Sequence, residues 1–523
     1  MIYRSPFPDV DIPEVPLHDY VFELTDRWPD KPALIDGPTD RTITYAQLRS
    51  AARGTAAGLA ARGFGKGDVL AVYSPNLPEY AVAFFGASMA GGINTTINPL
   101  YTAPELHRQL DDSGAKYLVT IPPFLDKARE AVEDTAVKEV FVFGEAEGAT
   151  PFASLRSSEP APTVAINPKE DLVALPYSSG TTGLPKGVML SHSNLVSNIA
   201  QTDAVERLTQ AEVLIGILPF FHIYGMVVIM SGALRVGATV VTMPRFDIEQ
   251  FLALVPKHGV TIGYVVPPIV LALAKHPAVD NYDLSTLTSI LSGAAALPEP
   301  VARACAERNG TVVRQGYGLT ETSPVTHFNP RDREIKVTSV GPAAPNTVYR
   351  IVDLASRQNV PAGEVGEVWV RGPQVMKGYL HNPEATRAMI DEDGWLHTGD
   401  LGYADADGYL YVVDRVKELI KYKGQQVAPA ELESVVQSHP AVADAAVIPS
   451  PDLEAGEVPK AFVVVKPGLD VTADEIIAHV ADRVAPHKKV RRVEFIDTIP
   501  RVPSGKILRR QLVERERASA TDS

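Results

Sequence analysis

Cysteine is the scarcest residue type of this chain, since Cys305 is the only one among 523 residues. One cysteine cannot form an intrachain disulfide, and its isolation excludes a disulfide-rich secreted scaffold and a thiolate metal site. This usage suits a reducing interior, so we expect a cytoplasmic protein. Cys305 itself stands in a helical pattern of small residues and is expected to be buried.

Long hydrophobic runs are also missing. The most apolar region extends from Val213 to Met243, but Pro219, His222 and Arg235 interrupt it before the roughly 18 consecutive apolar residues of a membrane helix are reached. The region therefore predicts a buried core and no membrane span. The chain shows no basic segment followed by an apolar stretch near its start and no peroxisomal Ser-Lys-Leu at its end, so no targeting signal is expected.

Positively charged residues are fewer than negatively charged ones. Lys and Arg number 49 against 63 Asp and Glu, which gives a formal net charge of −14. No run of five basic residues occurs, so nucleic acid is not an expected partner. The hydrophobic fraction of 45% and the charged fraction of 21% are those of a globular protein, and the chain is expected to fold completely.

Short apolar runs of strand length alternate with longer segments of helical spacing, which is typical of an α/β fold built from βαβ units. Residues 69–73 predict a strand and residues 79–89 a helix. Further strands, rich in β-branched residues and suited to sheets covered on both faces, are predicted at 117–121, 139–143, 239–243 and 261–266.

The pattern changes from about Gly341 to alternating strands and tight turns, as at 367–371, Asp393-Gly394 and Asp407-Gly408. Asp-Gly pairs favour hairpin turns. We therefore expect a large N-terminal domain of parallel or mixed sheets with covering helices, which includes a β-rich subdomain over about 341–414.

A compact α+β unit follows Asp414. Pro429 opens one predicted helix, and the Thr-x-x-Glu box at 472–475 caps another. The chain is thus divided into an N-terminal domain of residues 1–414 and a small, mobile C-terminal domain of residues 415–523.

The densest motif of the chain is Tyr-Ser-Ser-Gly-Thr-Thr-Gly-Leu-Pro-Lys-Gly at 177–187. Glycines let backbone N–H groups approach an anion, hydroxyls donate to it or meet a metal, and Lys186 adds a positive charge. The Gly-Lys-Ser/Thr order of a Walker A loop is absent. A Gly/Ser-rich stretch alone is commonly a surface loop, but this order of residues favours phosphate binding.

Four further motifs occur in the chain, at 316–321 (Gly-Tyr-Gly-Leu-Thr-Glu), 394–400 (Gly-Trp-Leu-His-Thr-Gly-Asp), 414–424 (beginning Asp-Arg-Val-Lys) and 503–506 (Pro-Ser-Gly-Lys). Together with the loop at 177–187, they resemble the acyl-adenylate-forming superfamily over nearly the whole chain. Within it, residues 218–225 and 423–431 are most similar to 4-coumarate or cinnamate:CoA ligases of the bacterial type.

This resemblance implies a two-step reaction. A carboxylate is a poor electrophile, so it first displaces pyrophosphate from ATP to form an acyl-AMP, and CoA then takes the acyl group as a thioester. Because the carboxylate is already ionised at neutral pH, the first step needs positioning and charge neutralisation more than a general base. The implied substrates and cofactors are an aromatic acid such as cinnamate or 4-coumarate, ATP, Mg²⁺ and CoA.

The resemblance also implies the nucleotide contacts. The β- and γ-phosphates are expected on Ser178, Ser179, Gly180, Thr181, Thr182, Gly183 and Lys186. Thr181 and Glu321 are expected to place Mg²⁺, and Thr320 to touch the α-phosphate. Adenine is expected against Tyr317, beside Gln315 and Gly316. Asp400 and Arg415 are expected to hold the ribose, although alone they would pass for a surface acid and a structural arginine.

Four residues form the implied catalytic set, Lys506, His222, Thr320 and Glu321. Lys506 is expected to bridge the carboxylate and the α-phosphate as charge develops. His222 is expected to meet the carboxylate, although a histidine in an apolar stretch is ordinarily a satisfied core residue. The implied acyl pocket consists of His222, Tyr224, Ala294, Gly318, Pro324 and Val325.

For the second step the resemblance implies a rotation of the C-terminal domain about Lys417, which also lies near the nucleotide. Lys421 and Gln426 are then expected near the adenylate. CoA is expected to contact Arg245, Lys423 and Gly424. A cluster of lysines can also be a solvated face, and this alternative stays open.

Other functions remain possible on the same motifs. A medium-chain fatty or aryl acyl-CoA ligase shares the fold, and a luciferase-like reaction is not excluded by motif. An amino-acid activator is disfavoured because His222 stands where those domains commonly place an Asp. A non-catalytic adenylate-binding protein predicts a lost Lys506 or a damaged phosphate loop, and neither is seen. We expect a monomer or a weak homodimer; the natural acid, the pathway and the resting orientation of the small domain are not determined.

Overall fold

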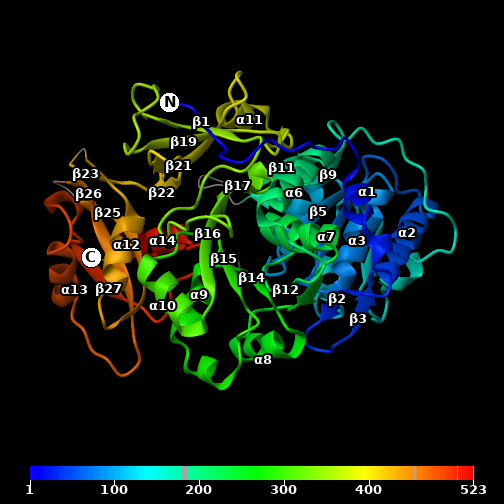
Figure 1. Cartoon of the computed structure of the whole chain (residues 1–523), viewed down its shortest axis with the longest axis horizontal. Helices are drawn as coiled ribbons and strands as arrows, with labels where there is room; N and C mark the ends of the chain where they lie inside the picture. The colour runs from blue at the N-terminus through cyan, green and yellow to red at the C-terminus, as the bar shows by residue number, and fades with distance from the viewer. Residues whose placement is uncertain (179–184, 424, 453–454, 503–504, 522–523) are drawn as a thin grey trace.

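The computed structural model describes residues 1–178, 185–423, 425–452, 455–502 and 505–521. Ser179, Gly180, Thr181, Thr182 and Gly183 of the expected phosphate loop, and Gly424 of the expected CoA contacts, lie outside these described residues. Figure 1 shows a large body made of two sheets with their helices, a β-rich sheet above it, and a small C-terminal domain at one side.

The sheet nearest the C-terminal domain is mostly parallel. Its order is β17 (Val325–Phe328), β16 (Val312–Gly318), β15 (Ser289–Ser292), β14 (Ile262–Val265), β12 (Val213–Gly216), β13 (Thr239–Thr242), β2 (Pro32–Asp36) and β3 (Thr42–Thr44). The strands from β16 to β2 are parallel to their neighbours, whereas the end strands β17 and β3 are antiparallel. Parallel neighbours end at the same edge, which places the loops after β12 to β16 together.

The second sheet is mixed. Its order is β10 (Tyr177–Ser178), β11 (Lys186–Ser191), β9 (Leu172–Ala174), β5 (Ile93–Ile97), β4 (Val69–Tyr73), β6 (Ala115–Thr120), β7 (Glu139–Val142) and β8 (Thr150–Pro151), with β20 (Gly378–Tyr379) paired to β11. Strands β10 and β11 form an antiparallel hairpin. Ser178 and Lys186, two residues of the expected phosphate loop, face each other in this pairing.

Helices cover both sheets of the large body (Figure 1). They are α1 (Leu17–Phe22), α2 (Tyr45–Ala61), α3 (Pro78–Met89), α4 (Ala103–Ser113), α5 (Leu125–Ala131), α6 (His192–Glu206), α7 (Gly232–Val236), α8 (Ile248–His258), α9 (Pro267–Lys275) and α10 (Glu299–Asn309). Helix α3 contacts β4 and β5 of one sheet and β2 of the other. Because it is covered on all sides, it is apolar around its whole circumference.

The β-rich sheet is antiparallel, in the order β1 (Tyr3–Arg4), β18 (Val348–Val352), β19 (Gly366–Arg371), β21 (Leu396–Ala404) and β22 (Leu410–Arg415), with α11 (Pro383–Met389) beside it. The edge strand β1 comes from the start of the chain and pairs Tyr3 with Tyr349, where the two rings stack with centroids 4.9 Å apart. Sequence patterning did not predict this strand, because two residues carry no periodicity.

The C-terminal domain has its own apolar core. Strands β24 (Gln425–Val427), β23 (Ile420–Tyr422), β26 (Gly456–Val465) and β25 (Val442–Asp452) form its sheet in that order, and β27 (Arg492–Phe495) pairs with β26. Helices α12 (Pro429–Gln437), α13 (Ala473–Ala481) and α14 (Arg509–Thr521) pack against this sheet. A distinct cluster that includes Leu432, Val447 and Ile476 is fully buried between them.

Several sequence predictions are confirmed. Residues 69–73 are β4, the helix expected at 79–89 is α3, and Thr472 caps α13 through the expected box. Cys305 is buried in α10. The region from Val213 to Met243 folds as β12, a π-helical segment over Tyr224–Ser231, α7 and β13, and no helix among the described residues is long and apolar enough to cross a membrane.

Candidate active site

The loops at one edge of the parallel sheet carry most of the predicted site. His222 follows β12, Arg245 follows β13, Val266 follows β14, Ala294 follows β15, and Tyr317 lies at the end of β16. Ligands of α/β proteins bind at the carboxyl ends of parallel strands. The topology therefore brings residues almost 100 positions apart to one edge.

His222 is half-buried at this edge. Its Nδ1 accepts a hydrogen bond from the backbone N–H of Tyr224 at 3.3 Å. Burial, assisted by the charge of Lys506, lowers the pKa of His222 to about 4. The ring is therefore neutral near pH 7, and because Nδ1 is an acceptor, its proton is on Nε2. A neutral ring of this tautomer can donate one hydrogen bond to a carboxylate.

Tyr224, one of the residues predicted for the acyl pocket, begins the π-helical segment. Its hydroxyl donates to the carbonyl oxygen of Leu291 at 3.1 Å. Gly293 lies against the same ring, since a Cβ there would be 2.9 Å from a ring carbon. Ala294 next to it is exposed and has a φ of +67°, a left-handed conformation that favours glycine.

The other residues predicted for the acyl pocket are Gly318, Pro324 and Val325. They form a tight backbone turn. A Cβ at Gly318 would be 2.0 Å from the carbonyl oxygen of Pro324, so no larger residue fits. The peptide between Ser323 and Pro324 is cis. The N–H of Val325 donates to the Asn198 side chain at 3.1 Å, which ties this turn to α6.

A buried acidic group lies where the ribose is expected. Asp400 on β21 stands opposite Arg415 on β22 in the antiparallel register. The Nε of Arg415 is 3.0 Å from Oδ1 of Asp400, and the hydroxyl of Tyr317 donates to Oδ2 at 2.6 Å. Burial raises the pKa of Asp400 above its usual range, although Arg415 and Tyr317 both favour the ionised form.

Lys506 enters this site from the C-terminal domain. Gly505 before it packs on the large domain, since a Cβ there would be 3.2 Å from the Val266 side chain. Burial, followed by the charge of Arg415, lowers the pKa of Lys506 to about 8, against the opposing effect of Glu418 and Asp400. The small domain is thus oriented with its lysine in the site, which the sequence did not determine.

Glu321, which is expected to place Mg²⁺, has a buried carboxylate. Its Oε1 accepts hydrogen bonds from the hydroxyls of Ser178 at 3.0 Å and Tyr379 at 2.8 Å. The ammonium of Lys186 lies 5.1 Å from the centre of the Tyr379 ring. Sequence reasoning missed Tyr379, because β20 reaches β11 only through tertiary pairing.

Gln315 and Gly316, which are expected beside the adenine, make contacts within the protein. The amide of Gln315 accepts from the N–H of Leu297 at 3.0 Å and donates to the carbonyl of Val337 at 2.6 Å. A Cβ at Gly316 would be 3.3 Å from the side chains of Leu291 and Phe328, closer than ordinary packing contact. Thr320 begins the short 3₁₀ turn that carries Glu321.

The remaining predicted contacts lie on or near the surface. Arg245 and Lys421 are exposed, and the N–H of Lys421 donates to Glu457 at 2.7 Å. Lys423 has a φ of +48°, and its N–H donates to the carbonyl of Ala455 at 2.9 Å. The backbone of Gln426 belongs to β24.

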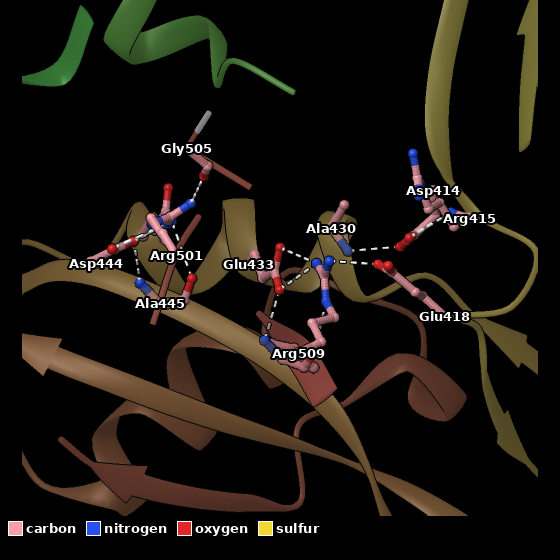
Figure 2. Close-up of polar contacts among 12 residues, drawn as sticks. Asp414, Arg415, Glu418, Ala430, Glu433, Asp444, Ala445, Arg501, Gly505 and Arg509 are labelled. Carbon is pink, nitrogen blue, oxygen red and sulfur yellow. Dashed lines mark hydrogen bonds and ion pairs between the residues drawn. The ribbon is translucent and has the colours of Figure 1, made fainter. Parts of the chain in front are cut away.

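The segment before Lys417, where the hinge is expected, is held from both sides. The N–H of Val416, beside Lys417, donates to the carbonyl of Gly399 at 2.9 Å. Two residues before Val416, Asp414 accepts the N–H of Ala430 in the first turn of α12 at 2.8 Å. Figure 2 shows this contact between the end of β22 and the C-terminal domain.

Comparison with known proteins identifies the family of the chain. Residues 21–380 match the family model described as AMP-binding enzyme, and residues 431–506 match the AMP-binding enzyme C-terminal domain. The 4-coumarate–CoA ligase 1 of Solanum tuberosum is 46% identical over 98% of this chain and 96% of its own length. The 4-coumarate–CoA ligase 1 of Petroselinum crispum is 45% identical over the same shares.

Solved structures show the same architecture. ATP-bound MatB from Rhodopseudomonas palustris has a TM-score of 0.87 at 30% identity, over 96% of this chain and 99% of its own. The anthranilate CoA ligase AuaEII in complex with anthranoyl-AMP has a TM-score of 0.89 at 29% identity, over 98% and 99%.

The chain belongs to the AMP-binding enzyme family, that is, to the acyl-adenylate-forming enzymes. Its relatives named above are 4-coumarate–CoA ligases that match nearly the whole chain. The family resemblance, the α/β fold class and the class of the enzyme, an AMP-forming acid–thiol ligase, are thereby confirmed.

Proposed function

We propose that this enzyme activates a cinnamate-type acid, cinnamate or 4-coumarate, as its acyl-AMP and transfers the acyl group to CoA. The observation that carries the proposal is the entry of Lys506 into a buried site beside Asp400, Arg415 and His222. The identity to 4-coumarate–CoA ligases, 46% over 98% of the chain, supports this choice of acid.

In the first step a carboxylate oxygen attacks the α-phosphorus of ATP, and the bond to pyrophosphate breaks. The acid and ATP are both anions, so cationic groups must offset their repulsion. Lys506 is assigned to the carboxylate and α-phosphate, and Lys186 with Ser178 to the outer phosphates. Asp400 accepts the ribose hydroxyls, and Tyr317 lies against the adenine.

Mg²⁺ is assigned to Glu321. This ion prefers oxygen ligands, and Glu321 offers a buried carboxylate next to the hydroxyl of Ser178. Those donors fit the ion, with Thr181 as the second proposed protein ligand. The bound ion would neutralise charge on the outer phosphates.

In the second step the CoA thiol attacks the acyl carbonyl carbon, and AMP leaves. Arg245, Lys423 and Gly424 are assigned to CoA, and Lys421 and Gln426 to the adenylate after the C-terminal domain turns about Lys417. The hydrogen bond from Ala430 to Asp414 spans this hinge and has to break during such a rotation.

The function is tested by pyrophosphate release with ATP and Mg²⁺ on cinnamate, 4-coumarate, ferulate, benzoate, octanoate and phenylalanine, with and without CoA. We expect the highest kcat/KM on cinnamate and 4-coumarate, and acyl-CoA only when CoA is present. A preference for benzoate or octanoate would contradict the proposed acid. Absence of acid-dependent release with every compound would contradict the ligase function itself.

Ala294 is expected to limit the size of the ring substituents. Ala294→Gly should raise kcat/KM for ferulate about 10-fold, because a methyl-sized change in such a wall alters discrimination by about 1–3 kcal/mol, and should change it little for cinnamate. Glycine also suits the φ of +67°. Ala295→Gly is the matched control, and an equal gain there, or no gain at position 294, would refute the assignment.

A further inference from the structure

The segment that carries Lys506 is held by a neighbouring arginine (Figure 2). The guanidinium of Arg501 donates from Nη2 to both carboxylate oxygens of Asp444, at 2.9 and 3.1 Å. Its other nitrogen, Nη1, donates to the carbonyl oxygen of Gly505 at 2.9 Å. Arg501 therefore connects the residue immediately before Lys506 to strand β25.

The backbone segments on the two sides of residues 503–504 pair with each other. The N–H of Val502 donates to the carbonyl of Lys506 at 2.9 Å, and the N–H of Leu508 donates to the carbonyl of Pro500 at 2.8 Å. These bonds join the segment of Lys506 to the segment of Arg501.

Asp444 is a rigid partner for Arg501. Its Oδ1 also accepts the N–H of Ala445 at 2.9 Å and the amide of Gln437 at 3.2 Å. The carboxylate is therefore fixed to both β25 and α12. The Arg501 and Asp444 side chains are 23% and 28% exposed, so the charge-assisted contact is partly shielded from water.

A second arginine holds the chain after Lys506. Arg509 at the start of α14 donates to both oxygens of Glu433 at 2.7 Å and to Glu418 at 2.5 Å. Arg509 thus anchors the helix that follows Lys506, while Arg501 ties the residue that precedes it to β25.

We propose that Arg501 is a positioning residue for acyl-AMP formation, which directs Lys506 into the active site by bridging Asp444 and the Gly505 carbonyl. The inference rests on the proposed function. An error of about 1 Å in a catalytic group can slow a reaction roughly 100-fold, so this bridge bears on rate without touching substrate. Lysine cannot replace Arg501, because a single ammonium lacks the planar guanidinium fork that donates to two acceptors.

The two half-reactions separate this role from a structural one. In acyl-AMP formation two anions meet, and the position of Lys506 is decisive. In thioester formation the acyl-AMP carries one phosphate charge and reacts at a carbonyl, so the demand for that cation is lower. Displacement of Lys506 should therefore affect the first half-reaction selectively.

The test uses the full chain with Arg501→Met, Arg501→Lys and Asp444→Asn. For each variant, single-turnover pyrophosphate release is compared with thioester formation from synthetic cinnamoyl-AMP and CoA. We expect kcat of acyl-AMP formation to fall about 10- to 100-fold, with the KM for ATP and the thioester step unchanged. The double variant Arg501→Met/Asp444→Asn should be no slower than Arg501→Met, because the two groups act as a unit.

Arg510→Met is the matched control, since Arg510 forms an exposed pair with Glu514 on the same helix; it should retain the wild-type rates. Equal loss in both half-reactions, a loss in Arg510→Met as large as in Arg501→Met, or unchanged acyl-AMP formation in Arg501→Met would each overturn the inference. Failure of the wild type to release pyrophosphate with any acid would instead overturn the proposed function.

Discussion

Replacement of Lys506 with alanine is expected to slow acyl-AMP formation about 100- to 1000-fold, the range found when one preorganised group is removed from a developing charge. Lys506 is the cation that the C-terminal domain brings into the buried site beside Asp400 and His222. Single-turnover pyrophosphate release with cinnamate measures the loss.

The same assay as a function of pH adds a second readout. Because the pKa of Lys506 is lowered to about 8, the side chain is cationic below that pH and neutral above it. Wild-type kcat/KM for acyl-AMP formation should therefore decline as the pH rises through about 8. In Lys506→Arg this decline should disappear, since arginine stays charged.

Lys506→Met is the matched control for packing, since methionine fills similar space without charge. It should behave as Lys506→Ala does. Thioester formation from synthetic acyl-AMP should persist in both variants. If either variant retained wild-type acyl-AMP formation, the catalytic assignment of Lys506 would be wrong.

Arg314→Met is expected to destabilise the large domain by about 3–5 kcal/mol, because it leaves a buried charge without its partner. The Arg314 side chain is 0% exposed and that of Glu206 5% exposed. The two are joined at 2.9 Å between Nη2 and Oε2, and Arg314 also donates to Ser289 at 3.0 Å and to Asn329 at 2.8 Å. Urea unfolding of the variant and the wild type measures the change in the free energy of unfolding, provided that their m-values are equal.

The double variant Arg314→Met/Glu206→Gln should recover part of this loss, since it removes both charges. Arg303→Met is the surface control: its pair with Glu299 is 59% and 40% exposed, and such pairs contribute about 0–1 kcal/mol. A loss no larger than that of Arg303→Met would contradict this expectation. The pair is linked to Tyr224, a predicted acyl-pocket residue, because Glu206 also accepts from Tyr264, whose ring neighbours Tyr224.

Much of the fold was predictable from local patterns. The run at 69–73 forms β4 because its apolar β-branched residues suit a covered strand. Thr472 caps the start of α13 because its side chain accepts the N–H of Glu475. By contrast, β1 and β20 are two residues each. They become strands only because a sheet strand from a distant part of the sequence forms hydrogen bonds with their backbone groups.

By itself, the sequence determined the α/β class, the family and the chemical groups of the site, since motif order and periodicity lie in adjacent residues. Tertiary structure alone decided which groups meet: Tyr379 on Glu321, Arg501 on Asp444, and Lys506 beside Asp400. The physical reason is that these contacts, and the lowered pKa of Lys506, depend on how separate sheets and domains pack and exclude water. No local pattern encodes that packing.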